Sequence, residues 1–334
     1  MPRFFILTAL TLCVAAGARA AQGPCAEFAR SVKATYNFRP SQLKGEDERA
    51  AKSAAMDRFW DSVKANKAEL LPCLRAALSD PQANNWFRFD GSNLLVFLDP
   101  SQESKAEQVR QYAAVDLDDV DLQLWLSTLA RRAAEGFDVS EAAARWLAYQ
   151  KAEYYLPQHG AYRVTKFEGA LYLYGSMDEV QATPALLKIV KQPGHPGRDY
   201  AAALLTLQAT PEALRALKAL DPAGLSAEAR AALRGVLEKP RLFEPRANPK
   251  TSREEFLKAF EAVLKGDYDD FFELTEKVPD GERDAVAVLK PEDLPLVRRV
   301  RRQIIAAANP HAAEYYDSFT RILLTLVWRP ELVK

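Results

Sequence analysis

The feature that most constrains the fold is a ten-residue pattern that occurs twice in the chain. Residues 182–191 read ATPALLKIVK, and residues 209–218, which start 27 positions later, read ATPEALRALK. Threonine is a favoured N-cap and proline is tolerated at the first helical position, so Thr183 and Thr210 each predict the start of a helix. The matched positions place two leucines on the buried face and two basic residues on the exposed face: Leu187 with Leu214, and Lys188 with Arg215.

A second helix follows each copy, and its pattern also recurs. Three small or apolar residues recur at an offset of 28: Ala201, Ala203 and Leu205 with Ala229, Ala231 and Leu233. Each unit therefore holds two short helices, and such a unit cannot bury its apolar face alone. The repeat predicts that neighbouring units stack on one another.

With this pattern the chain resembles a HEAT-like repeat protein, of the short-unit kind also seen in phycobilisome lyases. The resemblance covers residues 162–240, including a degenerate unit at 163–176. It implies an all-α fold, a HEAT-like α-solenoid of stacked helix pairs flanked by irregular helical segments. It also implies a concave surface for a protein or peptide partner. HEAT-like repeats carry no catalytic residues of their own, and activity toward bilins is not implied. An unrelated helical bundle is the alternative.

Helix signals continue through most of the remaining chain, where about one residue in six is alanine, the best helix former. Helices are expected over residues 24–37, 46–66 and 121–135, among others. Asp90-Gly91-Ser92-Asn93 is typical of a turn. No segment alternates between apolar and polar residues as a strand does, so essentially no sheet is expected.

The N-terminus carries the pattern of a secretory signal peptide. Arg3 precedes an uncharged apolar run over residues 4–16, and Ala18-Arg19-Ala20 supplies the small residues that signal peptidase recognises. Cleavage is expected after Ala20, so that the protein is periplasmic or secreted. The alternatives are an N-terminal membrane anchor or a lipoprotein attached through Cys13. No other segment has 18 uncharged apolar residues, so no transmembrane segment is expected after cleavage.

Removal of residues 1–20 leaves two cysteines, Cys25 and Cys73. An oxidising compartment favours a bond between them, and two buried thiols are the alternative. Two cysteines and three scattered histidines form no zinc-ligand spacing, and no glycine-rich phosphate loop is present, so we expect neither a metal nor a cofactor. With 45 basic and 45 acidic residues the formal charge is zero, which argues against nucleic-acid binding.

The domain boundaries follow from these signals. After the signal peptide, an N-terminal helical region is expected over residues 21–158 and the HEAT-like repeats over 159–240. Three prolines within residues 238–250 predict a linker, placed at 241–250, because proline at this density cannot continue a helix. A C-terminal helical region then fills 251–334, where Ser252 and Glu255 form a capping box.

The densest charge feature is a basic cluster on a predicted C-terminal helix: Arg298, Arg299, Arg301 and Arg302. It could bind an anion or an acidic partner, or it could be a solvated helix face. Two acidic runs, at residues 116–121 and 267–273, resemble helix starts more than calcium loops. Glu168 could be buried, or it could face water, and His195 is most simply a turn residue.

Two functions from different classes remain. The first is an exported, non-catalytic α-solenoid that binds a protein or peptide, with no catalytic residue assigned. The alternative is an exported helical hydrolase or lyase whose site assembles from distant residues. A pocket with two converging acids would favour the enzyme.

Overall fold

The computed structural model describes residues 23–39, 42–149, 153–156, 162–238, 242–267, 281–307 and 312–327. It confirms the all-α class, since helices make up nearly all of the regular structure that it describes. The chain divides into two compact units, residues 1–121 and 122–334. The predicted signal peptide lies outside the described residues. Among the helices described, none has both the length and the apolar character needed to cross a bilayer.

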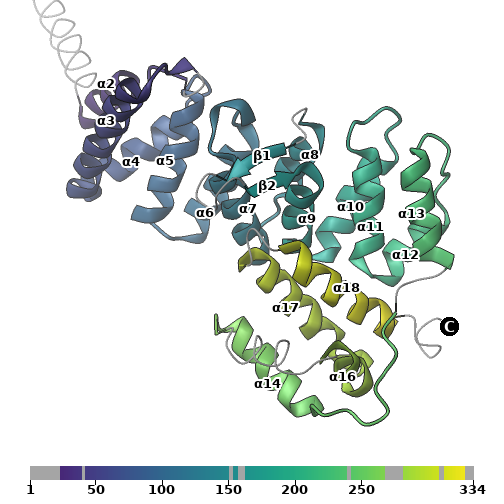
Figure 1. Cartoon of the computed structure of the whole chain (residues 1–334). Helices are drawn as coiled ribbons and strands as arrows, with labels where there is room; N and C mark the ends of the chain where they lie inside the picture. The colour runs from purple at the N-terminus through teal and green to yellow at the C-terminus, as the bar shows by residue number, and fades with distance from the viewer. Residues whose placement is uncertain are drawn as a thin grey trace, which may run out of the picture. The chain divides into compact units, whose positions relative to one another are not determined.

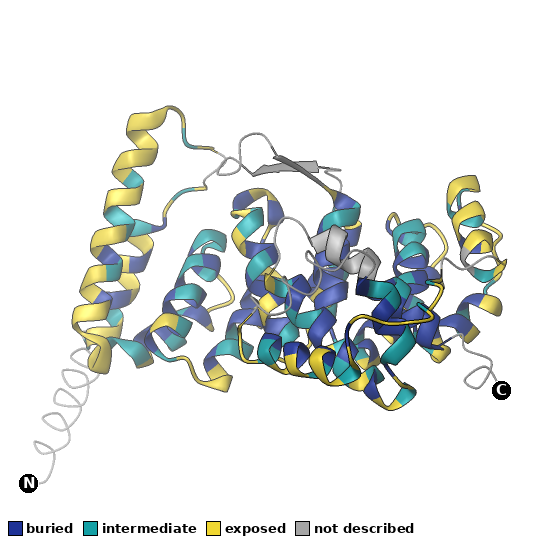
Figure 2. Cartoon of the chain, turned by 60° about the horizontal axis from the view of Figure 1, so that its bottom comes forward, coloured by how far each residue is buried: buried dark blue, intermediate teal, exposed yellow. Residues whose placement is uncertain are grey.

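The first unit consists of consecutive short helices packed side by side (Figure 1). Its elements are α2 (Pro24–Thr35), α3 (Glu46–Ala65), α4 (Lys67–Leu78), α5 (Asn85–Leu98), α6 (Gln102–Ala114) and the 3-10 turn η2 (Leu117–Asp119). Helix α4 packs on α2 and α5, and α5 packs on α6. Phe28, Val32 and Tyr36, four residues apart, are buried in one core with Phe59 and Val63 of α3, as the spacing predicts. The rest of α3 is largely exposed (Figure 2).

The predicted turn at residues 90–93 is wrong, because these residues lie inside α5. Gly91 is there for close packing and not for a turn. A Cβ atom at this position would lie 2.9 Å from the Phe87 ring and 3.3 Å from a Leu78 methyl group of α4. Ser101 caps α6, and its hydroxyl accepts the backbone N–H of Ser104.

The second unit contains three helix pairs that contact one another in sequence (Figure 1). After α7 (Leu122–Ala134), the pairs are α8 (Ser140–Ala148) with α9 (Lys166–Ser176), α10 (Glu179–Val190) with α11 (Arg198–Gln208), and α12 (Pro211–Lys218) with α13 (Ala227–Glu238). First helices contact first helices, α8 with α10 and α10 with α12. Second helices do the same, α9 with α11 and α11 with α13.

A two-stranded hairpin connects α8 to α9 and departs from the expectation of no sheet. Strands β1 (Glu153–Leu156) and β2 (Tyr162–Thr165) pair antiparallel, with Glu153 opposite Thr165. Tyrosine and valine, both enriched in strands, supply much of these segments. Each strand has four residues, which is too short to give a recognisable alternation in the sequence.

The two repeat copies begin their helices differently. Thr210 is the N-cap of α12, as predicted, and accepts the backbone N–H of Ala213 at 2.9 Å. The same prediction for Thr183 is wrong, because α10 begins earlier and is capped by Asp178, which accepts the N–H of Val180 at 3.0 Å. Pro184 therefore lies within the helix. The carbonyl that loses its partner belongs to Val180, which is 80% exposed, so water can satisfy it.

The two copies of the repeat bury only some of the side chains that the sequence predicts. Leu214 is buried, but Leu187 is half-buried and the neighbouring Leu186 takes the core position. Lys188 and Arg215 are exposed, as predicted.

The C-terminal helices belong to the same compact unit as the helix pairs. They are α14 (Arg253–Leu264), α16 (Gly281–Val288), the 3-10 turn η4 (Pro291–Asp293), α17 (Leu294–Ala307) and α18 (Ala312–Val327). The predicted capping box of Ser252 and Glu255 starts α14. Helix α17 packs on α7 and α9, and Tyr172 of α9 donates to the Ala306 carbonyl at 3.0 Å. The helix predicted after Asp267 lies outside the described residues.

Candidate functional site

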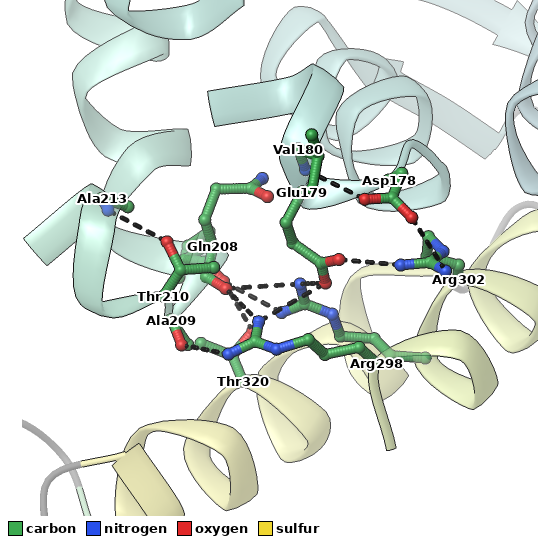
Figure 3. A network of polar contacts seen from close by, with 12 residues as sticks. Asp178, Glu179, Val180, Gln208, Ala209, Thr210, Ala213, Arg298, Arg302 and Thr320 are labelled. Carbon is green, nitrogen blue, oxygen red and sulfur yellow. Dashed lines mark hydrogen bonds and ion pairs between the residues drawn. The ribbon is translucent and has the colours of Figure 1, made fainter. Parts of the chain in front are cut away.

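Three arginines of the predicted basic cluster face one buried carboxylate (Figure 3). Arg301 Nη2 lies 2.9 Å from Glu179 Oε1, Arg302 Nη1 lies 2.7 Å from Oε2, and Arg298 Nη1 lies 3.5 Å from Oε1. Arg302 also pairs with Asp178 at 3.3 Å. Arg301 is only 1% exposed. The cluster thus joins α17 to the start of α10.

Backbone carbonyls at the end of α11 complete this arginine network. Arg298 donates to the Ala209 carbonyl at 2.7 Å, and Arg301 donates to the Leu207 carbonyl at 3.0 Å. Ala209 has a φ of +53°, a left-handed conformation that turns the chain after α11. The last carbonyls of a helix carry partial negative charge, so this helix end attracts the guanidinium groups as Glu179 does.

The pKa of Glu179 is set by its burial and by the arginines around it. Burial alone would raise the pKa of its carboxyl group, but the charges of Arg301, Arg298 and Arg302 outweigh burial and lower it. Glu179 is therefore ionised at neutral pH. The cluster was expected either to bind an anion or acidic partner or to form a solvated helix face, and three of its four arginines instead pair with Glu179. Arg299 is the exposed member of the cluster.

The other candidate residues take structural roles where the structure describes them. Asp116 caps η2, and Asp119 is buried, with Arg39 at 3.9 Å. Glu168 closes a capping box by accepting the N–H of Thr165 at 2.7 Å. His195 Nδ1 accepts the N–H of Gly197 at 3.0 Å, and burial and then the charge of Lys166 lower the pKa of His195. The described residues contain no group of three or more possible metal ligands. Three acidic residues of the second acidic run lie outside the described residues: Asp269, Asp270 and Glu273.

A pocket in the first unit is the feature that sequence reasoning missed. It has a volume of about 470 Å³ and lies beside α2, α4 and the start of α5. Val32, Tyr36 and Phe87, all buried in the core, contribute its apolar floor. Small side chains on the two facing helices leave the space open, and polar residues stand at its rim: Ala29, Ala76 and Ala77, then Lys33, Asn37, Asp80 and Gln82.

The Cys25–Cys73 disulfide stands in the wall of this pocket. The structure places the two sulfur atoms within bonding distance, with 4.8 Å between the Cα atoms. The bond ties the first turn of α2 to the middle of α4. Cys25 is exposed, whereas Cys73 is 2% exposed.

A polar cluster adjoins the pocket through Tyr36. The Tyr36 hydroxyl and Trp60 Nε1 both donate to Asp90 Oδ2, the second at 2.7 Å. Burial raises the pKa of Asp90, the two hydrogen bonds lower it, and the charge of Asp57 raises it again, with a net rise. Asp90 does not line the pocket. The cluster joins the end of α2 to α3 and α5 and fixes the position of Tyr36.

Comparison with protein-family models, with curated protein sequences and with solved structures finds no match to this chain.

Proposed function

We propose that the protein is exported and binds a protein or peptide partner, which inserts an apolar side chain into the pocket between α2 and α4. The observation that carries the proposal is the pocket itself. Its volume of about 470 Å³ lies within the range of ligand sites, and it combines an apolar floor with a few polar groups at the rim. Lys33 and Asp80 provide one charge of each sign there.

In this proposal the second unit is a HEAT-like scaffold. The support is the sequential contact of three helix pairs, of which α10–α11 and α12–α13 correspond to the two copies of the sequence repeat. Export is supported by the signal-peptide pattern of residues 1–20 and by the cysteine pair.

The lining of the pocket also bears on the alternative, an exported hydrolase or lyase. Among the described residues, Asp80 is the carboxylate that lines the pocket, and its Oδ1 accepts the backbone N–H of Gln82 at 2.9 Å. Glycoside hydrolysis needs two carboxyl groups that converge on the scissile bond. The lining therefore favours binding over catalysis.

The test is to fill the pocket without disturbing the core. Ala29 is exposed and lines the pocket, so Ala29→Trp places an indole in it. Ala34 is exposed on the same helix and lines neither pocket beside α2, so Ala34→Trp is the matched control. A partner from the native envelope fraction should be retained by the unmodified protein and by Ala34→Trp, and lost with Ala29→Trp. Equal retention by all three proteins would reject the proposed site.

A further inference from the structure

The two cysteines of the disulfide differ in how far they are exposed. Cys25 is an exposed residue in the first turn of α2, and Cys73 is 2% exposed within α4. Both residues line the pocket. A thiol that enters the pocket therefore reaches the disulfide most readily at Cys25.

The surroundings of Cys25 attract an incoming thiolate. The first turn of a helix is the positive end of its dipole. Lys33 lines the same pocket two turns further along α2. Glu27, the acidic residue of the first turn, lines a different pocket together with Phe28 and Ser31, so its charge lies on another face of the helix.

We propose that Cys25 is a site of thiol–disulfide exchange with a low-molecular-weight thiol that enters the pocket. The incoming thiolate forms a new bond to Cys25 Sγ, and the bond between the two cysteine sulfurs breaks. The electron pair leaves on Cys73 Sγ, which takes up a proton. The incoming thiol is oxidised and Cys73 is reduced, so no further oxidant or reductant is needed.

Exchange at Cys25 removes the covalent tie between α2 and α4. A helix of 12 residues is too short to persist in isolation, so α2 then depends on its buried side chains alone. Because α2 forms one wall of the pocket, the exchange also loosens the pocket. This inference does not rest on partner binding, and the two can fail separately.

The direct test treats the full chain with excess reduced glutathione and maps the products. Glutathione is expected on Cys25 with Cys73 as a free thiol, at a rate that does not change when a low concentration of urea is added. Glutathione on Cys73, or a rate that rises steeply with urea because exchange requires unfolding, would overturn the proposal. The absence of any mixed disulfide would overturn it as well.

A matched pair of variants measures the asymmetry independently. A neutral disulfide reagent should label Cys25 in Cys73→Ala at least ~100-fold faster than it labels Cys73 in Cys25→Ala. In guanidinium the two thiols should react at similar rates, which shows that the difference comes from the fold. Similar rates in the native proteins would contradict the proposal. If either variant does not fold, the glutathione reaction of the unmodified protein decides alone.

Discussion

Glu179 is a single side chain that forms ion pairs with three arginines from another part of the chain. The residues next to Glu179 in the sequence give no sign of these ion pairs, because the partners lie on α17, about 120 residues later. Removing this carboxylate is destabilising, because Arg298, Arg301 and Arg302 each lose an ion pair in a largely buried setting.

We predict that Glu179→Gln lowers the free energy of unfolding of the second unit by about 3–5 kcal/mol. Glu212→Gln, at an exposed position in the first turn of α12, is the control and should change it by less than about 0.5 kcal/mol. Because the folded pKa of Glu179 is lowered, its contribution is present above the unfolded pKa of about 4.3 and is lost as the pH falls below it. Urea unfolding at several pH values measures both effects. Equal stability of the two variants would contradict the network.

Asp90 is predicted to have the opposite pH dependence. Its folded pKa is raised, chiefly by burial, so the folded state holds a proton that the unfolded state has lost. The stability of the first unit should therefore fall as the pH rises from about 3.9, the unfolded value, through the raised folded value. Asp90→Asn should remove this fall, measured by hydrogen exchange of α2, α3 and α5. A fall of the same size in the variant would show that another group is responsible.

At the scale of the element, two helical glycines have opposite roles. A Cβ at Gly169 of α9 would lie 2.5 Å from the buried Trp146 ring, whereas a Cβ at Gly235 of α13 meets nothing within 4 Å. We predict that Gly169→Ala destabilises the protein by about 1–3 kcal/mol through overpacking. Gly235→Ala should instead stabilise it by about 0.5–1 kcal/mol through helix propensity. Thermal unfolding of the pair gives the sign of each change, and a stabilising Gly169→Ala would contradict the packing described.

The two repeat threonines give a second contrast. Thr210→Ala should cost about 1 kcal/mol, because it removes the N-cap of α12. Thr183 is buried and its hydroxyl has no hydrogen-bond partner, so Thr183→Val should leave stability unchanged or raise it by about 1 kcal/mol. Calorimetry of the two variants measures these changes. If Thr183→Val lost as much stability as Thr210→Ala, Thr183 would act as a helix cap after all.

Local patterns predicted most helices well and tertiary contacts explain the misses. The four-residue spacing of Phe28, Val32 and Tyr36 matches the side chains that this segment buries. Gly91 was misread because its turn-like neighbours do not reveal that α4 approaches closely. Thr183-Pro184 was misread because the start of α10 is set by Asp178 and by the pairing of Glu179 with α17. No local signal in the sequence encodes either contact.

At the scale of the whole molecule, the proposed function rests on the first unit, although the repeat that suggested binding lies in the second. The pocket between α2 and α4 could not be predicted, because it depends on where small side chains from two helices face each other. The disulfide pairing was predictable, since cleavage after Ala20 would leave only two cysteines.

Site-specific photo-crosslinking tests the central claim, that the α2–α4 pocket binds a partner. A photoreactive phenylalanine derivative is placed at residue 29 or at residue 34, both exposed on α2, and the cells are irradiated. The account predicts a discrete crosslinked protein with the derivative at position 29, in the pocket wall, and none with it at position 34. Crosslinks of equal yield at both positions, or none at position 29, would contradict it.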